Sequence, residues 1–116
     1  MITNQTKKFT IIKKAQVCKS IFSKAFGFMF RFKKPEKALV FVFNHERRAD
    51  LHMLFVFFPI DVLFLDKDKR VVDIKKEFKP FTYYSPQAKA MYVVEVPVGV
   101  LGKTRLGDSI DFEEKL

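Results

Sequence analysis

The sequence predicts a mainly β protein of the α+β class, with a small antiparallel-rich sheet that closes or curls strongly into a barrel-like shape and carries two short helices. Fifteen of its 116 residues are phenylalanine, and valine and isoleucine recur throughout. Aromatic and β-branched side chains suit a pleated, half-buried surface. The apolar runs are short and separated by turn residues, as in small β domains. Closure is expected because a flat sheet this rich in Phe and Val would expose edges that invite aggregation.

The length predicts one domain over residues 1–116, with residues 1–8 as a flexible N-terminal tail. Hydrophobic residues make up 48% of the chain, which excludes a disordered protein because such chains lack the apolar surface needed to fold.

The N-terminal half is expected to begin with a strand over residues 9–13. Polar and apolar residues then alternate at helical spacing from 19 to 26, which predicts a short helix that ends near Gly27. The apolar run 38–43 is short enough for a central strand buried on both faces. The polar segment 44–50 is predicted to be an exposed loop.

Strands are expected over 51–58 and 60–65, with a bend at Pro59 because proline cannot donate to a sheet ladder. The rest of the chain is assigned from the same patterns: a hairpin turn over 66–69, a strand over 70–74, a structured aromatic loop over 78–86, a strand over 90–96, one or two helical turns within 98–106, and a last strand over 109–112.

The chain carries 22 Lys and Arg against 13 Asp and Glu, a net charge of +9. This surplus attracts nucleic acid, anionic lipid or acidic proteins, and it also favours solubility. Cys18 is the single cysteine, which excludes an intrachain disulfide and fits a reducing compartment, so a cytoplasmic location is expected. The strongest apolar stretch, 51–65, is shorter than the roughly 20 residues of a spanning helix, and no membrane span or secretion signal is predicted.

Several separated segments carry a family resemblance: Gly27-Phe28-Met29-Phe30-Arg31, Leu51-His52-Met53, Phe58-Pro59-Ile60-Asp61-Val62, Phe64-Leu65-Asp66, Tyr92-Val93-Val94-Glu95-Val96-Pro97-Val98-Gly99 and Gly107-Asp108. In order and spacing they resemble an uncharacterised conserved family, the domain of unknown function 192. The resemblance covers about residues 9 to 112. It implies a compact, mainly β fold with small helices, and it implies no established activity.

The chain departs from the family pattern in two places. Lys69 stands where the family usually has a glycine, so a left-handed turn there would carry about 1 kcal/mol of strain unless the turn differs. Many bacterial members also carry an export signal, which this sequence lacks, so a periplasmic role does not transfer to it.

Asp61 is the most notable acid because it lies inside an apolar run, where a buried carboxylate must be paired or protonated. Arg31 is its predicted partner, since a guanidinium binds a carboxylate through two parallel hydrogen bonds. Two alternatives remain open: Asp61 faces solvent, or it accepts backbone N–H bonds at the proline bend. With His52 and Glu95, these residues are candidates for a polar cluster if the strands bring them together.

No catalytic residue, metal site or cofactor is predicted. His45 and His52 have Glu46 and Asp50 nearby, but their spacing matches no metal-binding motif. No serine lies in a G-x-S-x-G elbow, and the glycines form no phosphate-binding loop.

The function favoured by the sequence is a small non-enzymatic binding module. Its candidate surface is the aromatic loop with Phe81, Tyr83 and Tyr84, which would bind a protein or a small molecule. The alternative is a nucleic-acid-binding domain, in which these aromatics stack on bases and scattered basic residues neutralise phosphates. An enzyme with a polar cleft around Arg31, His52, Asp61 and Glu95 is less favoured. The basic residues in question are Lys7-Lys8, Lys13-Lys14, Lys33-Lys34, Arg47-Arg48, Lys67, Lys69, Arg70 and Lys75-Lys76.

Overall fold

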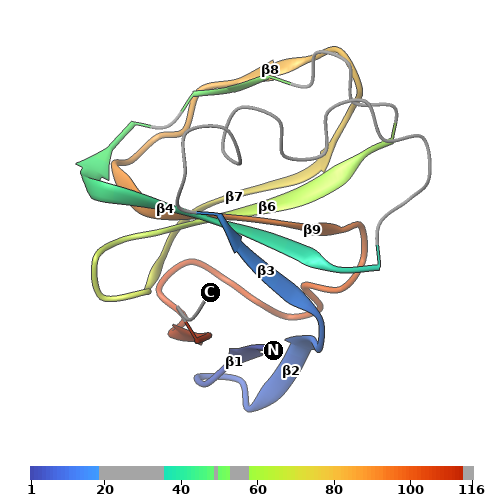
Figure 1. Cartoon of the computed structure of the whole chain (residues 1–116), viewed down its shortest axis with the longest axis vertical. Helices are drawn as coiled ribbons and strands as arrows, with labels where there is room; N and C mark the ends of the chain where they lie inside the picture. The colour runs from blue at the N-terminus through green and yellow to red at the C-terminus, as the bar shows by residue number, and fades with distance from the viewer. Residues whose placement is uncertain (19–35, 49, 53–57, 114–116) are drawn as a thin grey trace.

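The computed structural model describes residues 1–18, 36–48, 50 and 58–113, together with the backbone of residues 51–52. Its strands are β1 (Ile2–Asn4), β2 (Phe9–Ile12), β3 (Ala15–Cys18), β4 (Ala38–Arg47), β5 (Leu51–His52), β6 (Ile60–Leu65), β7 (Val71–Phe78), β8 (Tyr83–Tyr84), β9 (Ala90–Pro97) and β10 (Ile110–Asp111). A five-stranded sheet of order β3-β4-β9-β6-β7 lies between a three-stranded sheet, β10-β1-β2, and the short pair β5-β8 (Figure 1).

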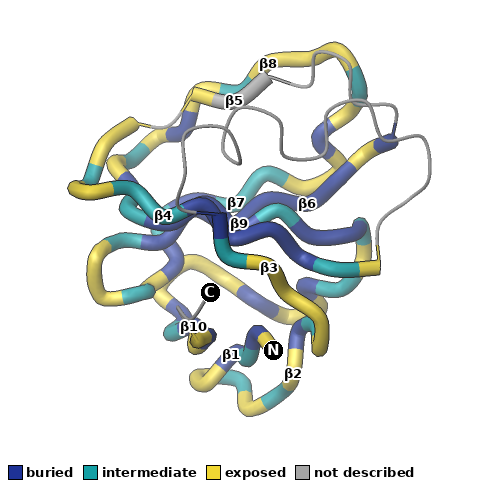
Figure 2. The backbone as a smooth tube through the Cα atoms, in the orientation of Figure 1, coloured by how far each residue is buried: buried dark blue, intermediate teal, exposed yellow. Residues whose placement is uncertain are grey.

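The interior strands of the large sheet are the apolar runs of the sequence. All six residues of β6 are buried, as are the first four of β4. Each of these strands has a neighbour on both sides and a layer of the protein over each face, so their buried residues are apolar on both faces, with Asp61 of β6 as the exception. Figure 2 shows the buried segments concentrated in this middle layer. The predicted strands over 38–43 and 60–65 are confirmed.

Alternating side chains of β6 build two separate cores on the two faces of the sheet. Val62 and Phe64 pack with Leu39 and Phe78 on the face toward β5-β8. The neighbouring residues of β6, Leu63 and Leu65, pack on the other face with residues of the small sheet, including Ile2 and Ile110. Because successive side chains of a strand point to opposite faces, β6 contributes apolar side chains to both cores.

The predicted closed or curled, barrel-like sheet is wrong. The five-stranded sheet is open, because its outer strands β3 and β7 do not pair with each other. Its faces are covered by the layers on either side, which removes the need for closure. One edge is blocked locally, since the backbone N–H of Val71 donates to Asp108 and that of Gly107 donates to Val71, at 2.9 and 2.8 Å. The sheet is also mixed, because β3 and β4 run parallel.

The two predicted short helices are not seen in the described residues, which contain no α-helix. Residues 98–107 form successive turns instead. Gly99 and Gly102 adopt φ angles of +97° and +57°, which a right-handed helix does not allow. The other predicted helix, over 19–27, lies outside the described residues. Across the described part of the chain, no helix has the length and apolarity needed to cross a membrane.

Three local features of the structure bear on smaller expectations. The predicted flexible tail contains β1, whose Ile2 is fully buried. The predicted loop over 44–50 is shorter than expected because β4 continues to Arg47, which pairs with Ala90 after a register shift. The turn at Lys69 is left-handed, with φ +61°, so the chain adopts there the conformation that favours glycine.

Candidate functional site

Asp61 is buried in β6 and accepts backbone hydrogen bonds. Its Oδ1 accepts from the N–H of Glu77 at 2.8 Å, and its Oδ2 accepts from the N–H of Gly99 at 3.0 Å. These bonds fit the alternative in which Asp61 satisfies its charge through backbone donors. Arg31, the partner predicted for it, lies outside the described residues.

Glu95 occupies a different environment in β9. It lies directly opposite Leu39 of β4 and Val62 of β6, both of which are buried and apolar. Desolvation in these surroundings raises the pKa of the half-buried Glu95 carboxyl to about 7. No described residue donates a hydrogen bond to it.

Of the four residues in the predicted polar cluster, the structure describes the side chains of Asp61 and Glu95. Asp61 pairs with Val96, and the next residue of β6, Val62, pairs with Glu95. Since successive side chains of a strand point to opposite faces, the Asp61 and Glu95 carboxyl groups lie on opposite faces of the sheet. His52 contributes its backbone to β5, opposite Tyr83 of β8. The side chain of His52 lies outside the described residues.

The aromatic loop is held in place by a buried carboxylate that the sequence did not single out. Asp73 Oδ2 accepts a 2.7 Å hydrogen bond from the Tyr84 hydroxyl and a 2.9 Å bond from the N–H of Gln87. The Tyr84 ring packs on Phe64 and Phe78, with centroid distances of 5.8 and 6.3 Å. Desolvation, followed by the hydrogen bond and the charge of Asp73, raises the pKa of Tyr84 to about 12.

The three predicted aromatic residues of this loop divide into two groups. Tyr84 is half-buried and serves as the anchor described above. Phe81 and Tyr83 project outward, with 59% and 62% of their surface exposed. Phe81 also adopts φ +62°, a left-handed conformation that is uncommon for a bulky side chain. The loop thus presents two large aromatic side chains from a backbone that is tied to the sheet.

The sequence predicted no metal site around His45 and His52, and the side chain of His52 lies outside the described residues. His45 is exposed in β4, and Asp50 accepts a 2.7 Å hydrogen bond from the hydroxyl of Ser85. No group of three His, Cys, Asp or Glu side chains with ligand geometry is present among the described residues.

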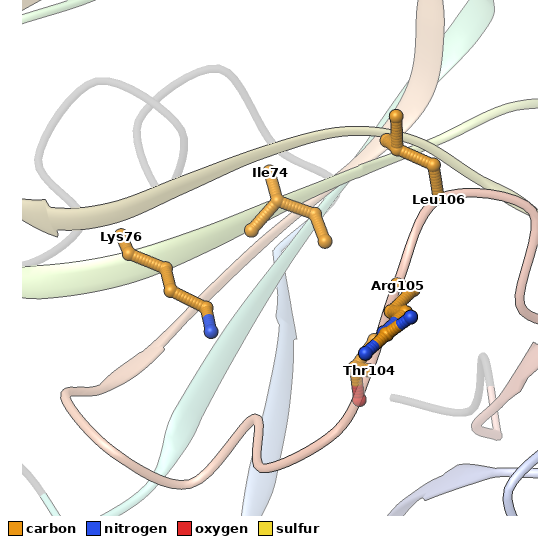
Figure 3. Close-up of a pocket in the computed structure, with 5 residues that line it drawn as sticks. All are labelled: Ile74, Lys76, Thr104, Arg105 and Leu106. Carbon is orange, nitrogen blue, oxygen red and sulfur yellow. The ribbon is translucent and has the colours of Figure 1, made fainter.

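A second concave feature lies on the other side of β7. An open groove with a volume of about 590 Å³ lies between β7 and the segment before Gly107. Figure 3 shows the residues that line it. The groove is lined by Ile74, Lys76, Thr104, Arg105 and Leu106.

Comparison with known proteins identifies the family. The family model DUF192, described as "Uncharacterized ACR", matches residues 1–112. The chain belongs to the DUF192 family. A UPF0127 protein of Pyrococcus horikoshii is 40% identical over 114 residues, which cover 95% of this chain and 96% of that protein. A UPF0127 protein of Thermococcus sibiricus is 36% identical over 117 residues, covering 97% of this chain and 75% of the relative.

Two crystal structures share the fold of this DUF192 member. One is a protein of unknown function from Novosphingobium aromaticivorans, with a TM-score of 0.76 and 22% identity over 84% of this chain and 74% of that chain. The other, from Sinorhizobium meliloti, has a TM-score of 0.75 and 20% identity over 84% of this chain and 79% of that chain. At this level of identity the similarity establishes the fold alone.

Sequence reasoning missed the residues that shape both surfaces of this DUF192 protein. Asp73 sits in a strand with Lys75 and Lys76, where alternation alone suggests a solvated face. The groove combines β7 with residues far along the chain, so no local pattern reveals it. Asp73 lies between apolar residues of its strand, as Asp61 does, and this pattern could have indicated that Asp73 is buried.

Proposed function

We propose that this protein is a non-enzymatic binding module that docks an apolar segment of a partner protein against Phe81 and Tyr83. The observation that carries the proposal is the exposure of both rings, 59% and 62%, on a loop anchored by Asp73. Large aromatic side chains dominate interface energetics when they are buried by a partner. A loop that is already ordered also reduces the entropic cost of binding.

The backbone at Phe81 supports the same conclusion. A non-glycine residue at φ +62° costs about 1 kcal/mol or more. Phe81 keeps 59% of its surface exposed, so only part of the residue is buried where this cost is incurred. Strained, exposed positions of this kind occur at ligand-binding sites.

The charges around the loop are mixed, because the exposed lysines Lys79 and Lys89 lie beside it together with two carboxylates, so charge does not by itself favour a nucleic acid. Asp50 contacts Ser85 at one end of the loop, and Glu77 is exposed just before its other end. Both carboxylates repel phosphate groups. Among the nearby cations, Lys75 lies 5.4 Å from the Tyr84 ring centroid and already has a favourable contact. The Sinorhizobium meliloti structure is described as that of a proposed transcription regulator, which makes nucleic acid the competing partner to test.

The test is a selection of a random peptide library on the intact protein, followed by fluorescence anisotropy with the enriched peptides. The matched variant is Phe81→Asn with Tyr83→Thr. Asn tolerates the left-handed conformation and Thr suits a strand, so both preserve the loop backbone. We expect apolar peptides whose affinity falls at least about tenfold in this variant, as for interface hot spots.

Leu106→Ser serves as the control, because it removes an apolar side chain that is 65% exposed outside the loop. It should leave peptide affinity unchanged. Fluorescent oligothymidylate is the second probe. If the oligonucleotide binds and the loop variant abolishes that binding while no peptide is selected, the surface is a nucleic-acid site and the proposal is wrong. Selected peptides that bind the loop variant equally well would also refute it.

A further inference from the structure

We propose that the groove between β7 and residues 104–106 binds a small phosphate monoester that carries an apolar group. This site is formed by residues other than those of the aromatic loop, so it is independent of the binding function proposed above. No known activity of the family assigns it.

Two cations converge on the groove from separate segments. Lys76 belongs to β7, and Arg105 belongs to the turn segment that follows β9. In Figure 3 their charged ends lie on the two sides of the groove, with Ile74 between them. Within the described part of the chain, neither side chain forms an ion pair or a hydrogen bond.

The neighbouring carboxylate is already occupied, so it does not neutralise these cations. Asp108 accepts hydrogen bonds from Lys7 Nζ at 2.8 Å and from Asn4 at 2.9 Å. It also accepts from the backbone N–H of Arg105 at 2.9 Å, and the Arg105 side chain lines the groove. Both cations are exposed and therefore accessible to an anion from outside the chain.

The wall that carries Arg105 is fixed before any ligand binds. The hydroxyl of Thr104 donates to the carbonyl of Leu101 at 2.7 Å and accepts from the side chain of Asn4 at 3.0 Å. Thr104 is itself buried. With the Asp108 bond to Arg105, these contacts tie the segment to β1, so binding has to order the Lys76 and Arg105 side chains but not the backbone that carries Arg105.

The remaining lining is apolar. Leu106 is 65% exposed and Ile74 is half-buried, and both border the groove. The groove has a volume of about 590 Å³ and is wide open to solvent, so a ligand there would remain partly exposed. A phosphate monoester carries close to two negative charges at neutral pH, which matches the two cations, and its organic group covers Leu106 and Ile74. A phosphodiester carries only one charge on each phosphate and matches less well.

The probe is phenyl phosphate, titrated into the isotope-labelled protein and followed by amide chemical shifts. We expect saturable shifts centred on residues 74–76 and 104–106. In the variant Lys76→Gln with Arg105→Gln, affinity should fall about tenfold, as expected for the loss of two partly exposed charge-assisted contacts. The control Lys13→Gln with Lys103→Gln removes the same charge from exposed positions outside the groove and should change affinity by less than about twofold.

Two further arms test the ligand class. Inorganic phosphate should bind more weakly than phenyl phosphate, and Leu106→Ser should weaken phenyl phosphate while leaving inorganic phosphate unchanged. Phenylacetate, with a single charge, should bind more weakly than phenyl phosphate. The proposal is overturned if the shifts do not saturate, if the control variant loses as much affinity as the groove variant, or if inorganic phosphate binds as tightly as phenyl phosphate.

Discussion

The carboxylate of Asp61 fixes the backbone of Glu77 across the sheet, through a 2.8 Å hydrogen bond from the Glu77 N–H to Oδ1. Glu77 adopts φ +50°, so the bond holds a residue that would otherwise avoid this conformation. The other oxygen of Asp61 holds Gly99, whose φ is +97°. One buried side chain thus stabilises two bends, at the end of β7 and after β9.

Replacing Asp61 with Ala should therefore destabilise the protein by about 3 kcal/mol, because two partly buried N–H groups lose charge-assisted bonds. Urea unfolding followed by circular dichroism measures this change. Asp111→Ala removes an exposed carboxylate in β10 and should cost less than about 0.5 kcal/mol. Equal losses in the two variants would contradict the role given to Asp61.

Glu95 should make the protein less stable as the pH rises through the neutral range. Its pKa is about 7 in the folded protein against 4.5 unfolded, so the folded state holds the proton more tightly. The stabilisation is complete below pH 4.5 and is lost as the pH rises through 7, a change on the order of 3 kcal/mol. In Glu95→Gln this loss should disappear, so the variant should be more stable than the parent at pH 8.

Unfolding curves measured from pH 4 to pH 8 test this prediction. Glu113→Gln is the control because Glu113 is exposed near the C-terminus and should leave the profile unchanged. A Glu95→Gln profile that still falls between pH 4.5 and 7 would show that another group is responsible.

Ionised Asp108 should stabilise the folded protein, and this stabilisation should be lost only in acid. Burial opposes its ionisation, but hydrogen bonds from Asn4, Lys7 and the N–H of Arg105 outweigh burial and lower its pKa to about 2. Its contribution to the stability of the fold is complete above pH 3.8, the pKa of this group in the unfolded chain, and is lost as the pH falls through 2. The shift corresponds to about 2 kcal/mol. Asp108→Asn should remove this part of the acid transition, as measured by unfolding between pH 2 and pH 5.

The sequence alone predicted the structure correctly where the pattern of a single strand was enough. The apolar run 38–43 predicted a strand buried on both faces, and the run 60–65, interrupted only by Asp61, predicted the strand β6, whose six residues are all buried. The sequence also singled out the exposed aromatic residues Phe81 and Tyr83 in a segment bounded by prolines, although it did not predict that Tyr83 belongs to the short strand β8.

The sequence alone did not predict features that depend on contacts between segments far apart in the chain. Nothing local shows that Ile2 completes a core with Ile110, and this pairing makes a covering layer where a barrel was expected. The spacing of apolar residues in 98–106 suggested helical turns, but Gly99 and Gly102 adopt left-handed φ angles instead. Arg105 and Lys76 likewise share a groove only because the chain returns to β7 after β9.

Tyr84→Phe should loosen the aromatic loop without removing its exposed rings. The variant loses the 2.7 Å bond to Asp73, which still accepts from Gln87 and Ile74, so the cost in stability should be about 1 kcal/mol. Amide hydrogen exchange should accelerate over residues 79–89 and remain unchanged in β6. Peptides selected on Phe81 and Tyr83 should bind the variant several-fold more weakly, because binding must then order the loop. If exchange accelerates and affinity does not change, the anchoring of the loop by Asp73 is structural only and contributes nothing to recognition.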